Sequence, residues 1–412
     1  MDNAPARATS GNLRAVRYLT YLMFFMFAMT TDSVGLVIPQ VIAEFGLSLT
    51  KAGALHYGSM AGIAGAGLCL GFLADRLGRK RAILAGLGLF SVTAYCVPLT
   101  QTFAQVLLLI SLAGVAIGIF KSAAVALVAD MSSSPTALTS TMNLVEGYFG
   151  LGAIIGPLVL GVLVARGVSW RWLYSIAGTL CLLLILTALN ARYPTHVRRN
   201  ASNRPGFLDT LRLLRNPYAV GFGLAAFSYV AVECAIYVWM PTLLSDYRGR
   251  WATLTLRALP AFFMLRALGR FIGAWLLHYL DWTKVLAICS AAIFACFVAS
   301  TAGGIEVALF LLPLSGLFMS VLYPTINSKG VACFTAPEQG AVAGIILFFT
   351  CSGAVIGPLA MGVVGDIFGG AKAGFLLATV FAGVLAAGLL LNVLLQPARA
   401  QLARISTEFQ AS

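Results

Sequence analysis

The sequence is poor in charged residues. Asp, Glu, Lys and Arg make up only 10% of its 412 residues, whereas 60% are hydrophobic, and the mean hydropathy is +0.92. A chain of this length with so few charges cannot enclose all of its apolar surface in one water-soluble core. The composition excludes an ordinary soluble globular protein and predicts a protein that is solvated by lipid.

The sequence also lacks the motifs of common enzymes. Its eight cysteines are scattered without a C-x-x-C pair and without a nearby histidine cluster, so we expect neither disulfides nor a metal site. It has no phosphate-binding glycine loop and no Ser-His-Asp arrangement with supporting context. We therefore predict no enzymatic activity and no cofactor. His56, His196 and His278 fall in or near loops or helix ends, where solvated histidines are expected.

Long apolar segments recur along the whole chain instead. Each is long enough to cross a hydrocarbon core of about 30 Å as a helix. Lipid cannot satisfy free backbone polar groups, and these segments show no two-residue alternation, so helices are the only reasonable spanning structure. The fold class is thus an all-α membrane protein, with twelve predicted spans at 17–43, 53–74, 80–102, 104–130, 138–165, 168–190, 217–244, 251–279, 282–302, 306–333, 339–365 and 372–395.

The formal net charge of +13 is explained by the membrane rather than by nucleic acid, because the basic residues lie in alternate loops. Arginines precede the first span, follow the second at 76–81 and fill the segment 191–216, all on one side. By the positive-inside rule that side is cytoplasmic, which predicts a multi-pass protein of the inner membrane with both termini inside. The N-terminus has no cleavable signal pattern, so the first helix is expected to be retained.

An internal repeat divides the chain. The pattern G-x-x-x-G-P at Gly152, Gly156 and Pro157 recurs 201 residues later at Gly353, Gly357 and Pro358. Small residues at this spacing allow close helix packing, and a role in controlling helix bending is equally compatible with the pattern. We predict a tail at 1–16, a six-helix bundle at 17–190, a linker at 191–216, a second six-helix bundle at 217–395 and a tail at 396–412.

Four charged residues stand out inside the spans: Asp32, Lys121, Glu146 and Glu233. Each costs roughly 2.5–3.5 kcal/mol on an insertion scale, so each needs a partner, a water-filled cavity or a function. Lys121 and Glu146 lie at similar depths in consecutive spans. They form either a buried structural pair or part of a central cavity in which solute or proton exchange changes the pairing.

Polar side chains accompany these charges at helical spacing. Glu233 has Tyr229 and Tyr237 four residues away on either side, which predicts a carboxylate flanked by two phenols, or alternatively a core hydrogen bond. Tyr323 and Asn327 are likewise four apart, and Asn143 shares a face with Glu146. Amides and phenols suit hydroxyl-rich solutes.

Two further side-chain types near these spans leave their roles open. Trp239 could stack on a sugar ring, but a tryptophan near a helix end is more often an interfacial anchor, which is the expectation here. Spacing leaves undecided whether Arg266 and Arg270 face the cavity or the cytoplasmic surface.

The loop after the second span carries the sequence pattern G-x-x-x-D-R-x-G-R-x-R, at Gly71, Asp75, Arg76, Gly78, Arg79 and Arg81. It resembles the loop between helices 2 and 3 of the major facilitator superfamily. The resemblance implies two six-helix bundles related by a pseudo-two-fold axis that transport solutes by alternating access. It also implies that Asp75 caps a helix of the other half and that Arg76 and Arg79 engage acids such as Asp130, which locks the outward-open state.

Several segments are similar to the fucose:H+ symporter family, among them Asn143-Leu-Val-Glu146, Trp239-Met-Pro241 and Tyr323-Pro324-Thr325. The resemblance implies proton-coupled uptake of a small sugar, with Asp32 as proton carrier. One difference stands out. Lys121 replaces a glutamate of the family, and Glu146 stands where the family tends to have glutamine. A small organic anion or an acidic sugar thus becomes a credible substrate.

The predicted groups follow from these comparisons. Asp32, Glu146 and Glu233 are the candidate proton-coupling residues, and the substrate-binding candidates are Lys121, Asn143, Glu146, Tyr229, Glu233, Tyr237, Tyr323 and Asn327. The expected partners are a small-molecule substrate, protons and the lipid bilayer, around a monomer. Drug or metabolite efflux is the alternative, and Gly114 argues against it because proton-coupled drug antiporters usually carry arginine there. A non-transporting sensor is a third possibility.

Overall fold

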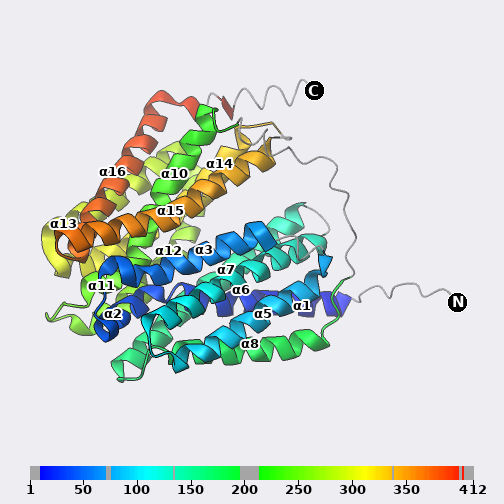
Figure 1. Cartoon of the computed structure of the whole chain (residues 1–412). Helices are drawn as coiled ribbons and strands as arrows, with labels where there is room; N and C mark the ends of the chain where they lie inside the picture. Colours follow the sequence, from blue (N-terminus) through cyan, green and yellow to red (C-terminus); the bar gives the residue numbers. More distant parts are fainter. Residues whose placement is uncertain are drawn as a thin grey trace. The chain divides into compact units, whose positions relative to one another are not determined.

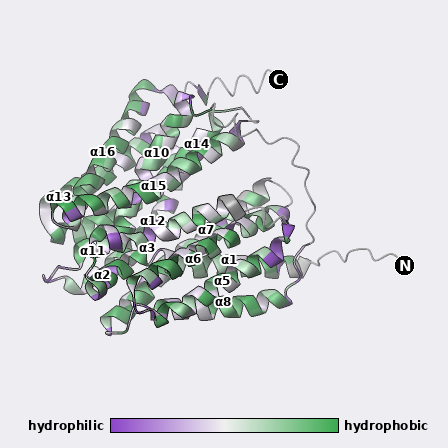
Figure 2. Cartoon of the chain, viewed as in Figure 1, coloured by the Kyte–Doolittle hydropathy of each residue, from purple (hydrophilic) through white to green (hydrophobic). Residues whose placement is uncertain are grey.

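The computed structural model describes residues 10–70, 76–132, 135–194, 213–335, 338–398 and 401–402, and these ranges contain helices and connecting turns but no strand. The chain divides into two compact units, one formed by Met1–Leu47 with Ala54–Asn200 and the other by Ser48–Gly53 with Ala201–Ser412. Apolar residues cover most of the helical surface in both units (Figure 2). The predicted all-α membrane class is confirmed.

The helices of the first unit follow the predicted spans (Figure 1). They are α1 (Ser10–Thr31), α2 (Val34–Phe45), α3 (Leu49–Leu70), α5 (Arg79–Cys96), a short 3-10 turn η1 (Val97–Leu99), α6 (Phe103–Asp130), α7 (Pro135–Ala165) and α8 (Trp172–Asn190). The first turn of α3 belongs to the second unit, and the rest of the helix belongs to the first.

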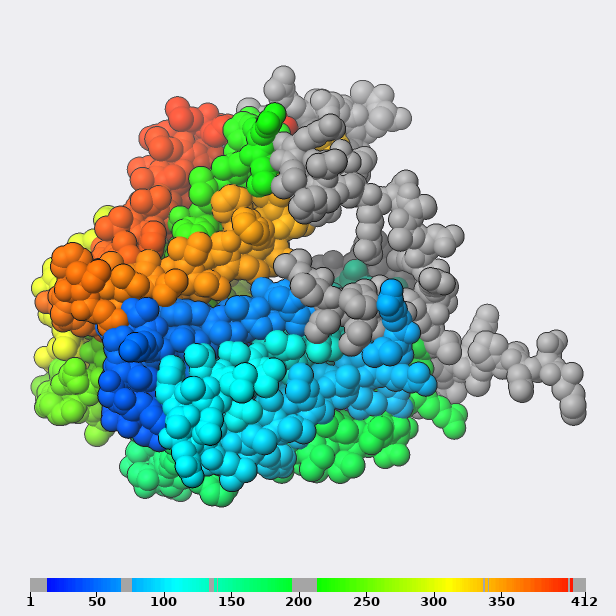
Figure 3. All heavy atoms as spheres, viewed as in Figure 1, coloured from blue at the N-terminus to red at the C-terminus, as the bar shows by residue number. Residues whose placement is uncertain are grey.

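The second unit repeats this helical composition. Its elements are α10 (Pro217–Cys234), the π-helical turn η2 (Ala235–Trp239), α11 (Met240–Leu244), the 3-10 turn η3 (Ala252–Leu254), α12 (Thr255–Tyr279), α13 (Trp282–Met319), α14 (Leu322–Ala332), α15 (Gln339–Phe368) and α16 (Ala371–Leu395). In the space-filling view α15 and α16, coloured orange to red, lie side by side on the visible face of this unit (Figure 3).

Ten helical stretches of the described residues are long and apolar enough to cross a membrane. The longest, Trp282–Ala332, is interrupted at Gly304, whose φ of 81° is left-handed backbone that glycine adopts without strain. It therefore contains the two predicted spans 282–302 and 306–333. The helix α3 coincides with most of the predicted span 53–74. The predicted total of twelve is thus visible in part.

The first span is not one continuous helix. It breaks at Asp32 and Ser33, which form a turn between α1 and α2. Neighbouring hydroxyls bond back to the carbonyls at the end of α1: Thr30 donates to Phe27 O at 3.0 Å and Ser33 donates to Met29 O at 2.6 Å. Such back-bonding competes with the helical ladder and favours a bend. The break places the Asp32 carboxyl at an irregular point of the backbone rather than on a plain helix face.

The repeated glycine pattern packs α7 against α1 and α15 against α10. At Gly152 and Gly156 an added Cβ would collide with the backbone of Phe25 and Met29. At Gly353 it would lie 2.5 Å from Phe227 O, and at Gly357 it would lie 2.7 Å from Ala231 Cβ. Both halves of the repeat therefore use their glycines for the same purpose, which is the close approach of two helix backbones.

We expect Gly156→Ala to destabilise the protein, because its methyl group has no room against Met29. Overpacking of this kind costs typically about 1–3 kcal/mol. The apparent melting temperature in detergent should fall by several degrees. Gly150→Ala on the same helix is the matched control, because nothing lies within 4 Å of its added Cβ. Equal melting temperatures for the two variants would contradict the close packing.

Candidate substrate and proton-binding groups

A charged cluster lies in the interior of the second unit. Glu233, near the end of α10, is 7% exposed, and its Oε1 lies 2.6 Å from Arg266 Nη2 in α12. The fully buried Tyr229 hydroxyl lies 3.1 Å from both Glu233 Oε1 and Met319 O. A buried carboxylate is tolerable when a cation and hydrogen-bond donors compensate its lost hydration. Arg266 and Tyr229 supply that compensation.

Tyr323 of α14 extends this group. Its ring stacks on that of Tyr229, with centroids 6.1 Å apart and planes tilted by 23°. Asn327, one helical turn further, is partly exposed. We call Tyr229, Glu233, Arg266 and Tyr323 the Glu233 cluster. Spacing within one helix predicted the phenol beside Glu233, but the arginine comes from a different helix, and only the tertiary structure brings it there.

Tyr237 lies in the π-helical turn Ala235–Trp239. Its hydroxyl lies 2.8 Å from Cys234 Sγ, and its ring stacks on Phe263 at 6.5 Å. Its role beside Glu233 stays a prediction.

Trp239 is not the interfacial anchor that its position near a helix end predicted. It is 2% exposed, and its indole N–H donates to Pro358 O of α15 at 3.0 Å. A buried indole needs an acceptor for its single donor, and this carbonyl provides it. Trp239 is therefore a packing residue between η2 and α15.

In the first unit Asp32 lies at the break between α1 and α2. The Thr31 hydroxyl lies 2.9 Å from Asp32 Oδ2 and 3.2 Å from Phe27 O. The carboxyl is partly exposed. A hydroxyl can donate to the charged carboxylate and can accept from the protonated acid, so Thr31 suits both states of Asp32.

His56 contradicts the expectation of a solvated histidine. It lies on α3 and is 1% exposed. It lines a cavity of about 20 Å³ together with Thr30, Thr31, Ser59 and Tyr174. Its position three residues after the start of the predicted span 53–74 suggested a helix end, but residues of α6 and α8 line the same cavity. His278 is exposed, and His196 lies outside the described residues.

Lys121 is partly buried on α6, and its Nζ lies 4.8 Å from the centroid of the Phe149 ring on α7. Glu146 and Asn143, one and two turns away on α7, are exposed. Both alternatives for Lys121 and Glu146, a buried structural pair and groups that line a central cavity, stay predictions.

Of the loop motif, the structure describes residues 76–81, because Gly71 and Asp75 lie outside the described residues. Gly78 has a φ of +86°, which explains the glycine at this position of the motif. Arg79 Nε lies 2.9 Å from Asp130 Oδ2 at the end of α6. Arg76 and Arg81 are exposed.

Lys80, between the motif arginines, caps another helix. Its Nζ donates to Leu189 O and Ala191 O, at 2.7 and 2.8 Å, at the C-terminus of α8. A cation at this end satisfies carbonyls that have no helical partner and complements the helix dipole. Burial raises the pKa of the adjacent Tyr193 phenol to about 12, so the ring beside Lys80 stays neutral. The loop therefore ties α5, α6 and α8 together.

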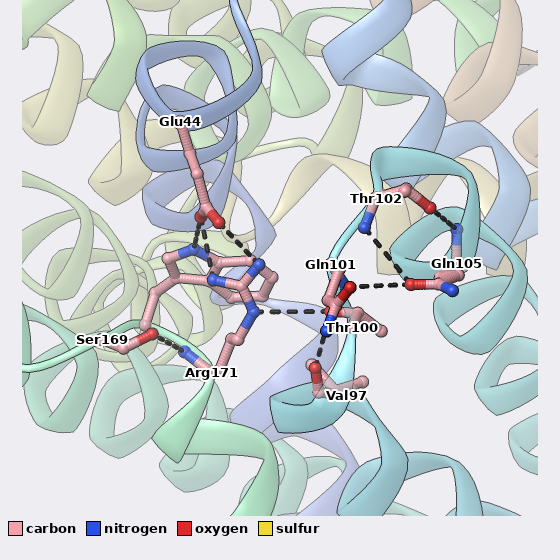
Figure 4. A network of polar contacts seen from close by, with 9 residues as sticks. Glu44, Val97, Thr100, Gln101, Thr102, Gln105, Ser169 and Arg171 are labelled. Atoms are coloured by element: carbon pink, nitrogen blue, oxygen red, sulfur yellow. Dashed lines mark hydrogen bonds and ion pairs between the residues drawn. The ribbon is translucent and has the colours of Figure 1, made fainter.

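The opposite end of the first unit holds a network that sequence analysis missed. Arg171 donates to both carboxylate oxygens of Glu44, at 2.9 and 2.7 Å, and Trp170 donates to Glu44 at 3.2 Å (Figure 4). Arg171 also reaches the Thr100 hydroxyl. The two-pronged geometry fixes α2 against the start of α8. The only sequence signal was an arginine on the side opposite to most basic residues.

Comparison with known proteins agrees with this architecture. Residues 20–358 match the profile of the Major Facilitator Superfamily. The L-fucose-proton symporter of Escherichia coli K12 is 25% identical over 380 residues, 84% of this chain and 86% of that protein. The chloramphenicol resistance protein CraA of Acinetobacter baumannii is 28% identical over 225 residues, 53% of each chain.

Among solved structures, a bacterial homologue of the human lysosomal transporter Spinster, in an inward-facing and unoccupied conformation, aligns with a TM-score of 0.77. The alignment covers 97% of this chain and 99% of that chain at 15% identity. At this identity the likeness shows the fold alone.

We expect Glu233 and Arg266 to behave as a coupled pair in stability measurements. Removing one partner of a buried ion pair costs about 3–5 kcal/mol because the other charge is stranded. Glu233→Gln and Arg266→Gln should each lower the melting temperature in detergent strongly, and the double variant should recover part of the loss. Arg270→Gln, exposed on the same helix, is the control. Additive losses in the double variant would rule out the pair.

Proposed function

Because this chain belongs to the Major Facilitator Superfamily, we propose that it is a secondary transporter that takes up a small organic anion or an acidic sugar together with protons. The family profile spans most of the chain, and the relatives include a fucose-proton symporter. These comparisons support a transporter. The identity of the solute and the coupling to protons are inferred from the chain's own charged residues.

The observation that carries the proposal is the ion pair of the Glu233 cluster. The Arg266 side chain is 25% exposed, whereas that of Glu233 is 9% exposed, so the guanidinium is the more accessible partner. A guanidinium binds carboxylate and phosphate groups with parallel hydrogen bonds. An anionic solute that binds Arg266 displaces the Glu233 carboxylate from its ion pair. Protonation of that carboxylate then becomes favourable, because it is buried without a cation beside it. Solute and proton binding are thereby coupled.

The first unit contributes the other two charged groups. Asp32 is the proposed proton carrier, and Lys121, placed where the fucose-symporter family has an acid, is a proposed solute-binding cation of this unit. Phenol and amide groups of Tyr229, Tyr323, Asn327 and Asn143 would bind hydroxyls of the solute. The Arg79–Asp130 pair is proposed to open and close during alternating access. The protein is proposed to act as a monomer in the inner membrane with both termini in the cytoplasm.

The test compares two sugars that differ only in a carboxylate, D-galactose and D-galacturonate, with the protein in liposomes that contain a pH dye. We expect internal acidification on addition of D-galacturonate and none with D-galactose. Empty liposomes and a protonophore are the controls for leak. Acidification by D-galactose would instead make this a neutral-sugar symporter and would contradict the anion proposal.

We expect Asp32→Asn to abolish proton-coupled accumulation while leaving solute exchange between two equal pools intact, because exchange needs no net proton movement. Lys121→Gln should weaken anion uptake by at least about tenfold, as expected for loss of about 1.4 kcal/mol of charge-assisted binding. Asp246→Asn, an exposed carboxylate outside these groups, is the matched control. Wild-type accumulation in Asp32→Asn would exclude Asp32 as proton carrier.

Efflux is the second candidate, and the similarity to CraA over half of each chain favours it. Gly114 opposes it. A Cβ at this position would lie 2.9 Å from Ser59 Cα of α3, so no larger side chain fits there. Chloramphenicol in the same liposomes distinguishes the two functions. Expulsion of this drug, driven by an imposed inward proton gradient, would establish efflux.

A further inference from the structure

We propose that His56 is a second proton-binding group, linked to Asp32 through Thr31 and a water molecule in the cavity that all the intervening groups line. This inference rests on the proposed proton coupling and deepens it. It concerns only residues of the first unit. The observations are the burial of His56, the polar cavity beside it and the hydrogen bond that connects the cavity lining to Asp32.

The burial of His56 calls for an explanation. An imidazole is a donor and an acceptor and titrates near neutral pH when unperturbed, so a histidine with 1% exposure is a poor packing residue unless polar groups surround it. Polar residues do lie beside it, because Thr30, Thr31, Ser59 and Tyr174 line the same cavity.

The cavity has the size that a relay requires. Its volume of about 20 Å³ exceeds the roughly 10–15 Å³ that one water molecule needs. The hydroxyls and the imidazole give that water several hydrogen-bond partners, which is the other condition for its occupancy. The remaining lining is apolar, from Val34, Leu55, Phe90, Ile110 and Ile117 among others, and shields the water from bulk solvent.

Thr31 connects this cavity to the proton carrier. It lines the cavity, and its Oγ1 lies 2.9 Å from Asp32 Oδ2. Thr30 lines the same cavity, but its hydroxyl donates to Phe27 O. Only one of the two adjacent threonines is therefore bonded to Asp32. A proton that leaves His56 passes to the water, the hydroxyl of Thr31 passes its own proton to Asp32, and Thr31 regains one from the water.

The charges around His56 favour this role. On the α1–α2 side the titratable group is Asp32, reached through Thr31. On α8 it is the Tyr174 phenol, and on α3 itself the ring of Tyr57 lies 6.3 Å away. The lining residues of α5 and α6 are uncharged, and Lys121 follows the last of them, Ile117, by one turn. Among the described residues that line this cavity or bond to its lining, Asp32 is the acid, and its ionised form stabilises the imidazolium.

The first test needs no solute. The chain has only three histidines, so histidine labelled with carbon-13 and nitrogen-15 yields three ring signals in nanodiscs. The signal lost in His56→Gln identifies His56. We expect it to titrate between about pH 5 and 8 and its midpoint to fall by about one pH unit in Asp32→Asn, because the carboxylate that favours imidazolium is gone.

His278, which is exposed, is the internal control and should titrate identically in both proteins. A His56 signal that stays unchanged across this pH range, or a midpoint that ignores Asp32→Asn, would overturn the proposal whatever the transport assay shows.

The second test uses the two threonines as a matched pair. Thr31→Val removes the hydroxyl bonded to Asp32, and Thr30→Val removes its neighbour in the same cavity. With the solute that acidifies wild-type liposomes, Thr31→Val and His56→Gln should slow proton-coupled uptake at least tenfold while solute exchange persists, and Thr30→Val should remain close to wild type. Equal effects of the two threonine variants would contradict a proton path through Thr31 and would indicate that His56 has a structural role. Proton-free uptake by the wild-type protein would instead defeat the proposed function itself.

Discussion

The structure depends on one constraint, the free energy of holding charge away from water in a protein whose surface is largely lipid-facing. With so few charged residues in the chain, each one inside a helical span must be compensated locally. The structure shows two solutions. Glu233 is neutralised by Arg266 and Tyr229 in the second unit, whereas Asp32 sits at a helix break beside a hydroxyl and a small polar cavity in the first.

These two solutions suggest different tasks. An ion pair at 2.6 Å makes proton uptake by Glu233 conditional on an event that removes the arginine, such as the arrival of an anion. The proposed link of Asp32 to His56 through Thr31 would let this carboxyl exchange protons without such an event. Two buried charges that compensate each other are energetically coupled. A change in the charge or position of one changes the free energy of holding the other, and transport can use such coupling.

Both candidate acids lie next to closely packed helix pairs. The glycines of α7 and α15 bring their helices against α1, which ends directly before Asp32, and α10, which carries Glu233. The same helix that ends in Glu233 continues as a π-helical turn, a local irregularity that recurs at functional sites. In both units a tightly packed helix pair thus leads into a break at the candidate proton-binding acid.

The sequence by itself determined the membrane class, most helix positions, the repeated glycine pattern and the presence of acidic and basic residues within the spans. These features rest on length, hydropathy and spacing, which are local properties. Tertiary structure alone decided what those charges meet. Arg266 reaches Glu233 from another helix, and α6 and α8 line the cavity of a buried histidine that its place in the chain suggested was solvated. Side-chain partners are set by how helices pack, and a one-dimensional pattern carries no distance between separate helices.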